Sequence, residues 1–251
     1  MSGHSKWANI KHKKAKVDAQ KGVAFAKFSR EIMLAAREGG GDPAGNFRLR
    51  TAIDKAKAAG LPNDNINRAI EKATGGGDAA ALESINYEGY GAGGVAIIVE
   101  ALTDNRNRTA GDIRSYFNKN NGNLGETGCV GWMFKDEGSI SIAKKGVSQE
   151  ALFECAINAG AEDFLDEDEE DFEIITTPAT LQSVAEELEK AGFVVKNAEV
   201  TKNPINTVKI EDESTARQVM RLLNALEDHD DVQNVYANFD IDDSILEKIE
   251  Q

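Results

Sequence analysis

Apolar residues recur at helical spacing in the first part of the chain. From about Val17 to Arg37 they are separated by three, four and three residues, which places them on one side of a helix. These residues are Phe25, Phe28, Ile32 and Ala35. The stretch Gly39-Gly40-Gly41-Asp42-Pro43 ends this helix, because glycine is costly inside a helix and proline disfavours helical geometry in the residue before it.

Two further helices and a linker follow. One is predicted from Asn46 to Ala59, and the next begins at Pro62. Their predicted inward residues are Phe47, Ala52, Ile53 and Ala56 in the first helix, and Ile66, Ala69 and Ile70 in the second. The glycines at 75–77 are typical of a linker. We therefore predict an N-terminal three-helix domain over residues 1–78.

The pattern changes to that of strands after Tyr87. Val95 to Leu102 is a nearly continuous apolar run, as expected for a buried strand, whereas Ser84 to Glu88 is a poor strand by the same criteria. Alternating strand and helix patterns continue to the end of the chain. Strands are predicted at 130–134, 139–143, 172–176, 193–200, 207–210 and 232–239, and helices at 148–159, 178–191 and 214–226. A further helix, which holds Ile113, Tyr116 and Phe117, is predicted between the polar turn 103–109 and Gly122.

The order of these elements predicts two nested α+β domains. Residues 134–203 form a self-sufficient ferredoxin-like α+β unit, opened by a hairpin around Lys135–Gly138. Residues 79–133 plus 204–251 supply the halves of a second such unit. The predicted fold is therefore α+β multidomain, with the helical domain followed by two ferredoxin-like domains, one inserted into the other.

Charge is distributed unevenly along the chain. The formal net charge is −14, yet residues 1–78 hold 15 Lys and Arg against 8 Asp and Glu, a net of +7. Within this region the first thirty residues carry eight basic residues against Asp18 alone. A basic segment on an acidic protein indicates a polyanionic partner, and the aromatic Trp7 within it can stack on bases. A solvated helix face is the competing interpretation.

The sequence offers little for catalysis or metal binding. Two cysteines without nearby histidine favour neither a zinc site nor a disulfide framework. Gly89 to Gly94 fits G-x-G-x-x-G, but a strand follows where a dinucleotide site needs a helix, so we expect a turn. The acidic run 166–171 lacks the ligand spacing of a calcium loop, and no Ser/His/Asp constellation is present. We expect no catalytic residues, no metal, no cofactor and no enzymatic activity.

A second candidate site is the polar stretch Asp104-Asn105-Arg106-Asn107-Arg108-Thr109. It lies where a strand ends and a helix begins, so that main-chain N–H groups and two guanidinium groups could converge on a phosphate. The alternative is a structural turn, with Asn107 or Thr109 as N-cap and the arginines paired to nearby acids. Both interpretations stay open at this point.

Several of these motifs together resemble the YebC family, which includes the mitochondrial translational activator of cytochrome oxidase subunit I. They are Gly3-His4-Ser5-Lys6-Trp7-Ala8, Lys11-His12-Lys13-Lys14, Gly39-Gly40-Gly41-Asp42-Pro43, Tyr87-Glu88-Gly89-Tyr90 and the 104–109 stretch. The resemblance runs from residue 2 to about 240. It implies three domains, a cytoplasmic protein, and regulation either of transcription through DNA or of translation on ribosomes. It brings no cofactor and no catalytic residue.

We therefore expect a non-enzymatic nucleic-acid-binding regulator of gene expression, with ribosomal RNA favoured over operator DNA as the partner. No apolar segment follows the basic N-terminus, so a secretory signal is not indicated and a cytoplasmic protein is expected. We further expect a monomer with no membrane partner and no small-molecule substrate. The predicted nucleic-acid-binding residues are Lys6, Trp7, Lys11, His12, Lys13, Lys14, Lys16, Lys27, Arg30, Arg106 and Arg108.

Overall fold

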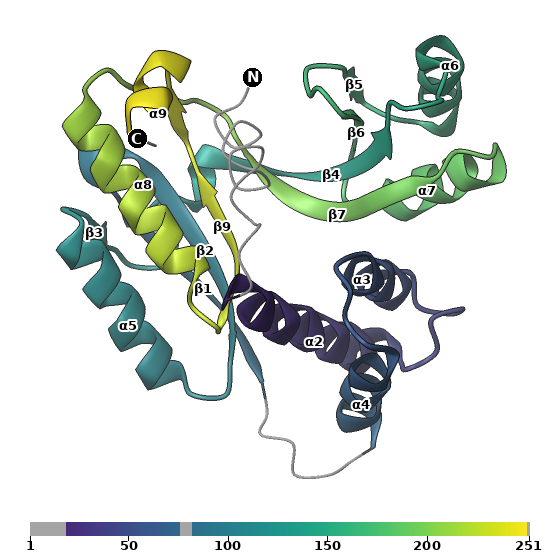
Figure 1. Ribbon diagram of the computed structural model, residues 1–251, viewed down its shortest axis with the longest axis horizontal. Helices are drawn as coiled ribbons and strands as arrows, with labels where there is room; N and C mark the ends of the chain where they lie inside the picture. The colour runs from purple at the N-terminus through teal and green to yellow at the C-terminus, as the bar shows by residue number, and fades with distance from the viewer. Residues whose placement is uncertain (1–18, 76–81, 250–251) are drawn as a thin grey trace. The chain divides into compact units, whose positions relative to one another are not determined.

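The computed structural model describes residues 19–75 and 82–249 of the chain (Figure 1). The fold is α+β, as predicted, with an N-terminal helical domain followed by two sheet-containing domains. Two compact units can be separated, and the smaller is the inserted domain, Lys135–Asn203. The larger contains the chain up to Phe134 and again from Pro204. Each part is described by itself below.

Three helices form the helical domain, and their apolar faces meet in one core. The helices are α2 (Ala19–Gly39), α3 (Phe47–Ala58) and α4 (Asn63–Thr74). Asn46 fixes the turn between the first two, because its Oδ1 accepts from Leu49 N at 3.0 Å while its Nδ2 donates to the carbonyls of Ala35 and Gly40, each at 2.8 Å. Seven predicted core residues are buried, namely Ile32, Ala35, Ala52, Ile53, Ala56, Ile66 and Ala69. In α3 Leu49 is also buried, although it was not predicted, whereas Phe47 is only partly buried.

The outer domain is built on a four-stranded sheet in the order β3-β1-β2-β9. All of its strand pairs are antiparallel. A short parallel pair, β8 and β10, extends this domain. The strands are β1 (Glu83–Tyr90), β2 (Ala96–Thr103), β3 (Asn123–Leu124), β8 (Val208–Ile210), β9 (Val232–Ala237) and β10 (Phe239–Ile241), and the helices are α5 (Arg106–Lys119), α8 (Glu213–Glu227) and α9 (Asp243–Ile249).

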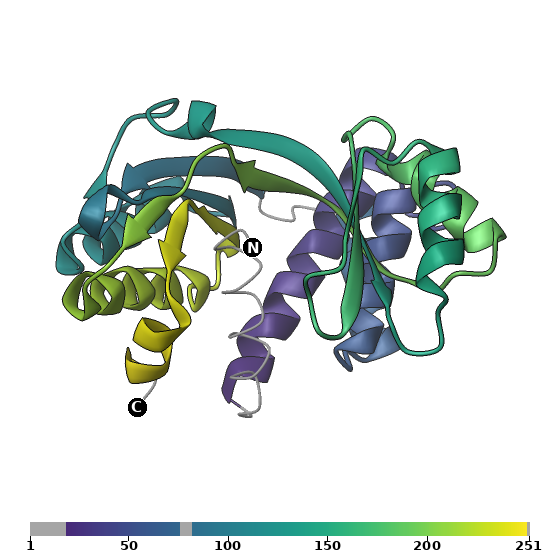
Figure 2. The ribbon, with the colours of Figure 1, turned by 90° about the horizontal axis from the view of Figure 1, so that it is seen from above.

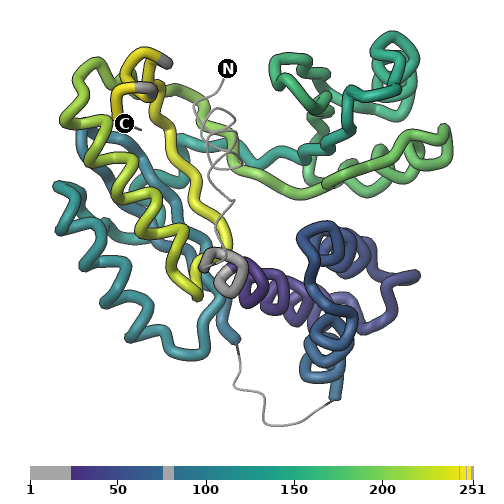
Figure 3. The backbone as a smooth tube through the Cα atoms, in the orientation of Figure 1, coloured from purple at the N-terminus to yellow at the C-terminus, as the bar shows by residue number. Residues whose placement is uncertain are grey.

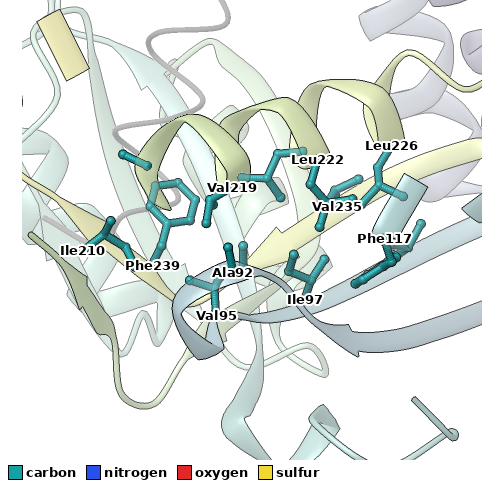
Figure 4. Packing of buried hydrophobic residues seen from close by; sticks show 14 of the residues in the cluster. Ala92, Val95, Ile97, Phe117, Ile210, Val219, Leu222, Leu226, Val235 and Phe239 are labelled. Atoms are coloured by element: carbon teal, nitrogen blue, oxygen red, sulfur yellow. The ribbon is translucent and has the colours of Figure 1, made fainter. Parts of the chain in front are cut away.

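Strand β2 is apolar at all positions except Glu100 and Thr103, because both of its faces are buried. Ile97 points toward α5 and α8 and packs against Phe117 and Leu222 in the main core (Figure 4). The alternate residue Ile98 lies on the opposite face and packs against Val130 in a second, smaller cluster. The segment after β3 therefore covers the face of the sheet that the helices leave free.

The inserted domain has the β-α-β-β-α-β order of a ferredoxin-like fold. Its sheet order is β5-β6-β4-β7, so the first and last strands are neighbours, and the tube trace shows them side by side (Figure 3). Helices α6 and α7 lie together over one face of this sheet (Figure 2). The elements are β4 (Phe134–Ala143), α6 (Gln149–Ala159), β5 (Asp163–Leu165), β6 (Asp171–Thr176), α7 (Leu181–Lys190) and β7 (Val195–Pro204).

Some predicted elements were wrong. The predicted hairpin around Lys135–Gly138 is one continuous strand, β4, preceded by a 3-10 turn at Gly131–Met133. Gly138 does not make a turn: it faces β6, where a Cβ would lie 2.1 Å from Thr176 Oγ1. Strand β1 is a complete strand, although its sequence has a poor strand pattern. The pattern is poor because only part of the strand is buried, so its exposed positions are polar. Strand β5 and helix α9 were not predicted, and a break at Asn238 separates β9 from β10.

Candidate nucleic-acid interface

The structure places four of the predicted site residues. Lys27 and Arg30 lie on α2, and Arg106 and Arg108 lie in the first turn of α5. The other seven lie outside the described residues. They are Lys6, Trp7, Lys11, His12, Lys13, Lys14 and Lys16.

The first turn of α5 is capped by Asn105. Its backbone is extended, and its Oδ1 accepts from Arg108 N at 3.1 Å. The expectation that Asn107 or Thr109 would be the N-cap was therefore wrong. Thr109 instead turns inward and is fully buried, and its hydroxyl donates to Asp231 Oδ2 at 2.8 Å. Helix α5 begins at Arg106, inside the stretch 103–109 that was predicted as a turn, because its first residues are polar.

A buried carboxylate organises this end of the outer domain. Asp231 lies just before β9 and is 2% exposed. Its Oδ2 accepts from Arg108 Nη2 at 2.8 Å and from the hydroxyls of Thr109 at 2.8 Å and Thr103 at 3.3 Å. The guanidinium of Arg108 also binds Asp104 Oδ1 at 2.9 Å. We call Thr103, Asp104, Arg108, Thr109 and Asp231 the Asp231 cluster.

The Asp231 cluster shifts the pKa of both charged partners. Burial by itself raises the pKa of Asp231, but the hydrogen bonds from Arg108 and Thr109 and the positive charge of Arg30 outweigh it, so this pKa lies below its ordinary value. The same hydrogen bonds, to Asp231 first and to Asp104 second, raise the pKa of Arg108. Asp231 and Arg108 are therefore both ionised at neutral pH, and their pairing ties the start of α5 to the start of β9.

Two predicted site residues on α2 reach the same segment. Arg30 Nη2 lies 3.2 Å from Asp231 Oδ1, and its guanidinium also bonds the carbonyl of Asp230. Lys27 donates to the carbonyl of Glu227. Arg30 and Arg108 thus meet on one carboxylate, whereas Arg106 is exposed beside them. Of the two interpretations of the 104–109 stretch, the structural turn with arginines paired to nearby acids agrees with Arg108, which pairs with Asp104 and Asp231.

A second organising carboxylate, Glu88, was not recognised in the sequence. It is 7% exposed, and it accepts from three main-chain N–H groups, those of Gly128 at 2.8 Å, Val130 at 2.8 Å and Gly131 at 2.7 Å. We call residues 125–133 the Glu88 loop. The sequence offered one signal for this contact: an acid, Glu88, at an inward position of a strand, with a glycine-containing segment at 125–131 further along the chain. Its partners are main-chain groups, which leave no mark in the sequence.

The remaining motifs have structural explanations. Gly89 and Tyr90 end strand β1, and Gly91 to Gly94 form the turn to β2 with a single 3-10 turn at Ala92–Gly94, so no α-helix begins here to receive a pyrophosphate. In the acidic run, Asp168 Oδ1 accepts from the main-chain N–H groups of Glu170 and Asp171. Lys144, just after β4, pairs with Asp166 and donates to the carbonyl of Asp168. Among residues 19–75 and 82–249, no group of His, Cys, Asp and Glu side chains is placed to hold a metal ion.

The helical domain keeps its positive balance in the part that the structure describes. Residues 19–75 contain ten Lys and Arg against six Asp and Glu, a net of +4. Arg48 is used internally, pairing with Glu31 at 3.0 Å and with Glu38. Lys57, Arg68 and Lys72 are exposed. These three side chains lie on α3 and α4 and present positive charge to solvent.

Within the described segments, no helix is both long and apolar enough to cross a membrane.

The protein is therefore of the class that combines a basic helical domain with two α+β domains, one inserted into the other. Two family descriptions match this chain: "TACO1/YebC protein N-terminal domain" over residues 5–76 and "TACO1/YebC second and third domain" over residues 82–239. The chain belongs to the TACO1/YebC family.

Relatives of nearly the same length support this membership. A "Probable transcriptional regulatory protein" of Sulfurihydrogenibium is 56% identical over 250 residues, covering all of both chains. Another with this name, from Desulfitobacterium hafniense, is 54% identical and covers 99% of each. The crystal structure of a conserved hypothetical protein from Aquifex aeolicus is similar with a TM-score of 0.84 and 51% identity, covering 92% of this chain and 95% of that one.

Proposed function

We propose that the protein is a non-enzymatic nucleic-acid-binding regulator of gene expression that acts on translation through contacts with ribosomal RNA. The observation that carries this proposal is the separation of charge along the chain. The helical region is positive, whereas the inserted domain has six lysines, no arginine and 17 acids. Phosphate is attracted to the first and repelled by the second, which limits the ways in which a nucleic acid can approach.

The residues divide into two roles. The lysines of the N-terminal arm and the exposed cations of α3 and α4 neutralise phosphates without reading sequence. Lys27 and Arg30, which bond the Glu227 carbonyl and Asp231, add to the positive potential of this region. Trp7 and His12 stack on bases, which favours RNA, because its loops and bulges offer unpaired bases. Arg106 and Arg108 form a second contact at the start of α5. Arg108 is 47% exposed while paired with Asp231, so it can hold a phosphate on its outer edge.

The first experiment measures binding of the full chain to purified ribosomes, to a labelled single-stranded RNA and to a labelled duplex DNA. The double variant Lys13→Glu with Lys14→Glu is compared with Lys145→Glu with Lys209→Glu, which changes the net charge equally outside the helical domain. The arm variant should bind at least about tenfold more weakly and show a shallower salt dependence, by about two in log–log slope for duplex DNA. Equal binding by both double variants would contradict the role of the arm.

Transcription control through DNA is the second candidate function. It is supported by the names of the relatives and by one geometric feature, the four-residue connection containing Gly60 between α3 and α4. Helix α4 exposes Asn67 and Arg68, side chains of the kinds that read base edges in a major groove. Cross-linking in cells followed by sequencing of the bound nucleic acid distinguishes the two functions, since ribosomal RNA signal supports translation and promoter signal supports transcription.

A further inference from the structure

Helix α6 of the inserted domain exposes two large apolar side chains on one side. Phe153 is 49% exposed and Ile157 is 46% exposed. They are four residues apart and therefore adjacent on the helix surface. The core-facing residues of α6 are Leu152 and Ala156, which lie about 100° away around the helix axis. Phe153 and Ile157 consequently contribute an apolar strip that the domain's own core does not cover.

Aromatic contacts hold one end of this strip in place. The ring of Phe153 meets the ring of Phe164 edge-on, with centroids 5.5 Å apart. Phe164 in turn lies 5.3 Å from Phe172, which is buried in the core. Phe153 is thus the outer end of a row of three rings, and its side chain is ordered before any partner arrives. Rigid, partly exposed aromatic side chains of this kind are typical anchors of protein interfaces.

Carboxylates border this strip. Glu150 and Glu154 lie on the neighbouring part of the α6 surface, each three or four residues from Phe153 or Ile157, and both are exposed. Helix α6 has no basic residue, and the domain as a whole has a net charge of −11. A phosphate-bearing partner would be repelled here, whereas a basic polypeptide would be attracted.

We infer that the strip formed by Phe153, Ile157 and Phe164 is a docking surface for a basic polypeptide that carries apolar side chains. The apolar side chains of the partner pack on Phe153 and Ile157, and its Lys or Arg residues pair with Glu150 and Glu154. Attraction between opposite charges speeds the encounter, and burial of the apolar strip slows dissociation. This surface is separate from the nucleic-acid contacts proposed above and does not depend on them.

The test uses the full chain and a short synthetic amphipathic peptide with leucines on one side of a helix and lysines on the other. Binding of the fluorescently labelled peptide is compared between the wild type and the double variant Phe153→Ser with Ile157→Ser. The double variant should bind at least about tenfold more weakly, as expected for loss of interface anchors. Because both side chains are half-exposed, circular dichroism should show an unchanged fold.

Matched controls separate docking from general stickiness and from charge attraction. Val194→Ser removes an apolar side chain that is 77% exposed beside β7, the edge strand opposite β5, and should leave binding unchanged. A peptide with serines in place of leucines should bind the wild type and the double variant equally weakly. Replacing Glu150 and Glu154 by glutamine should reduce the salt dependence of binding to the amphipathic peptide.

Three results would overturn the inference. The first is equal binding of the amphipathic peptide to the wild type and the Phe153/Ile157 double variant. The second is an equal loss in Val194→Ser. The third is self-association of the wild type in sedimentation experiments that the double variant abolishes, because the strip would then be covered by a second copy of this chain.

Discussion

Glu88→Gln is expected to loosen the Glu88 loop at a cost that can be estimated from its hydrogen bonds. The carboxylate accepts three main-chain N–H groups, two on Oε2 and one on Oε1. The side-chain amide keeps one acceptor oxygen. In its best orientation this oxygen retains the bonds from Val130 and Gly131, and the NH₂ group then faces the N–H of Gly128.

One hydrogen bond is therefore lost and two become weaker because the negative charge is gone. Bonds to a charged group contribute about 1.5–3 kcal/mol each, so the free energy of unfolding of the outer domain should fall by about 2–3 kcal/mol. Glu88→Ala should cost more, about 4 kcal/mol, because the buried N–H of Val130 then has no acceptor.

Urea unfolding followed by tryptophan fluorescence measures this change. The chain has two tryptophans, and in a Trp7→Phe background the signal comes from Trp132 alone. Trp132 reports on the Glu88 loop directly, since its Nε1 donates to Cys129 O at 3.1 Å. Hydrogen exchange of residues 126–133 tests whether the loop opens locally before the domain unfolds.

Glu83→Gln provides the control, because it makes the same chemical change at an exposed position of the same strand. Exposed substitutions of this kind usually change stability by less than about 0.5 kcal/mol. If Glu88→Gln and Glu83→Gln have the same unfolding midpoint and the same exchange rates over residues 126–133, the carboxylate does not hold the loop and the reasoning is refuted.

Two further predictions concern the outer domain. Asp231→Asn should lower the free energy of unfolding by about 2 kcal/mol at neutral pH. Because folding lowers the pKa of Asp231, the wild type should lose this extra stability as the pH falls below about 4 and then through the pKa of Asp231 in the folded protein. Thermal melts of both proteins at several pH values can follow the loss. An unchanged difference between the two proteins at low pH would refute this. Gly89→Ala should destabilise the domain by more than about 2 kcal/mol, since the new Cβ would lie 2.5 Å from Asn123 O, whereas Gly111→Ala, in open space on α5, should be neutral or stabilising in the same urea titration.

The sequence predicts best those elements whose apolar residues repeat at one period. Helix α3 and strand β2 were located within one or two residues, because the burial of Ala52, Ile53 and Ala56 and the run around Ile97 appear directly as patterns. It predicts poorly where a glycine or an acid has a role in packing. Gly138 resembles a turn residue in sequence but lies inside β4, because only a glycine fits against Thr176.

The candidate site shows the same limit. The sequence could mark Arg106 and Arg108 as notable, since they lie between a strand and a helix, but it could not show which acid holds Arg108. Asp231 is more than a hundred residues away and is one of several acids in its segment. Its selection depends on the pairing of β2 with β9, which places it beside Thr103 and Thr109. Strand pairing of this kind is not encoded in local periodicity.

The insertion also determines the order in which the domains can form during synthesis. Ile97 of β2 pairs with Ala237 of β9, and the whole inserted domain lies between them in the sequence. Its own strands pair within residues 135–203, so it can close while the chain is still being made. The outer sheet must wait, with one edge of β2 unpaired, until β9 leaves the ribosome. A nascent chain of this protein therefore carries a finished inner domain on an unfinished outer one.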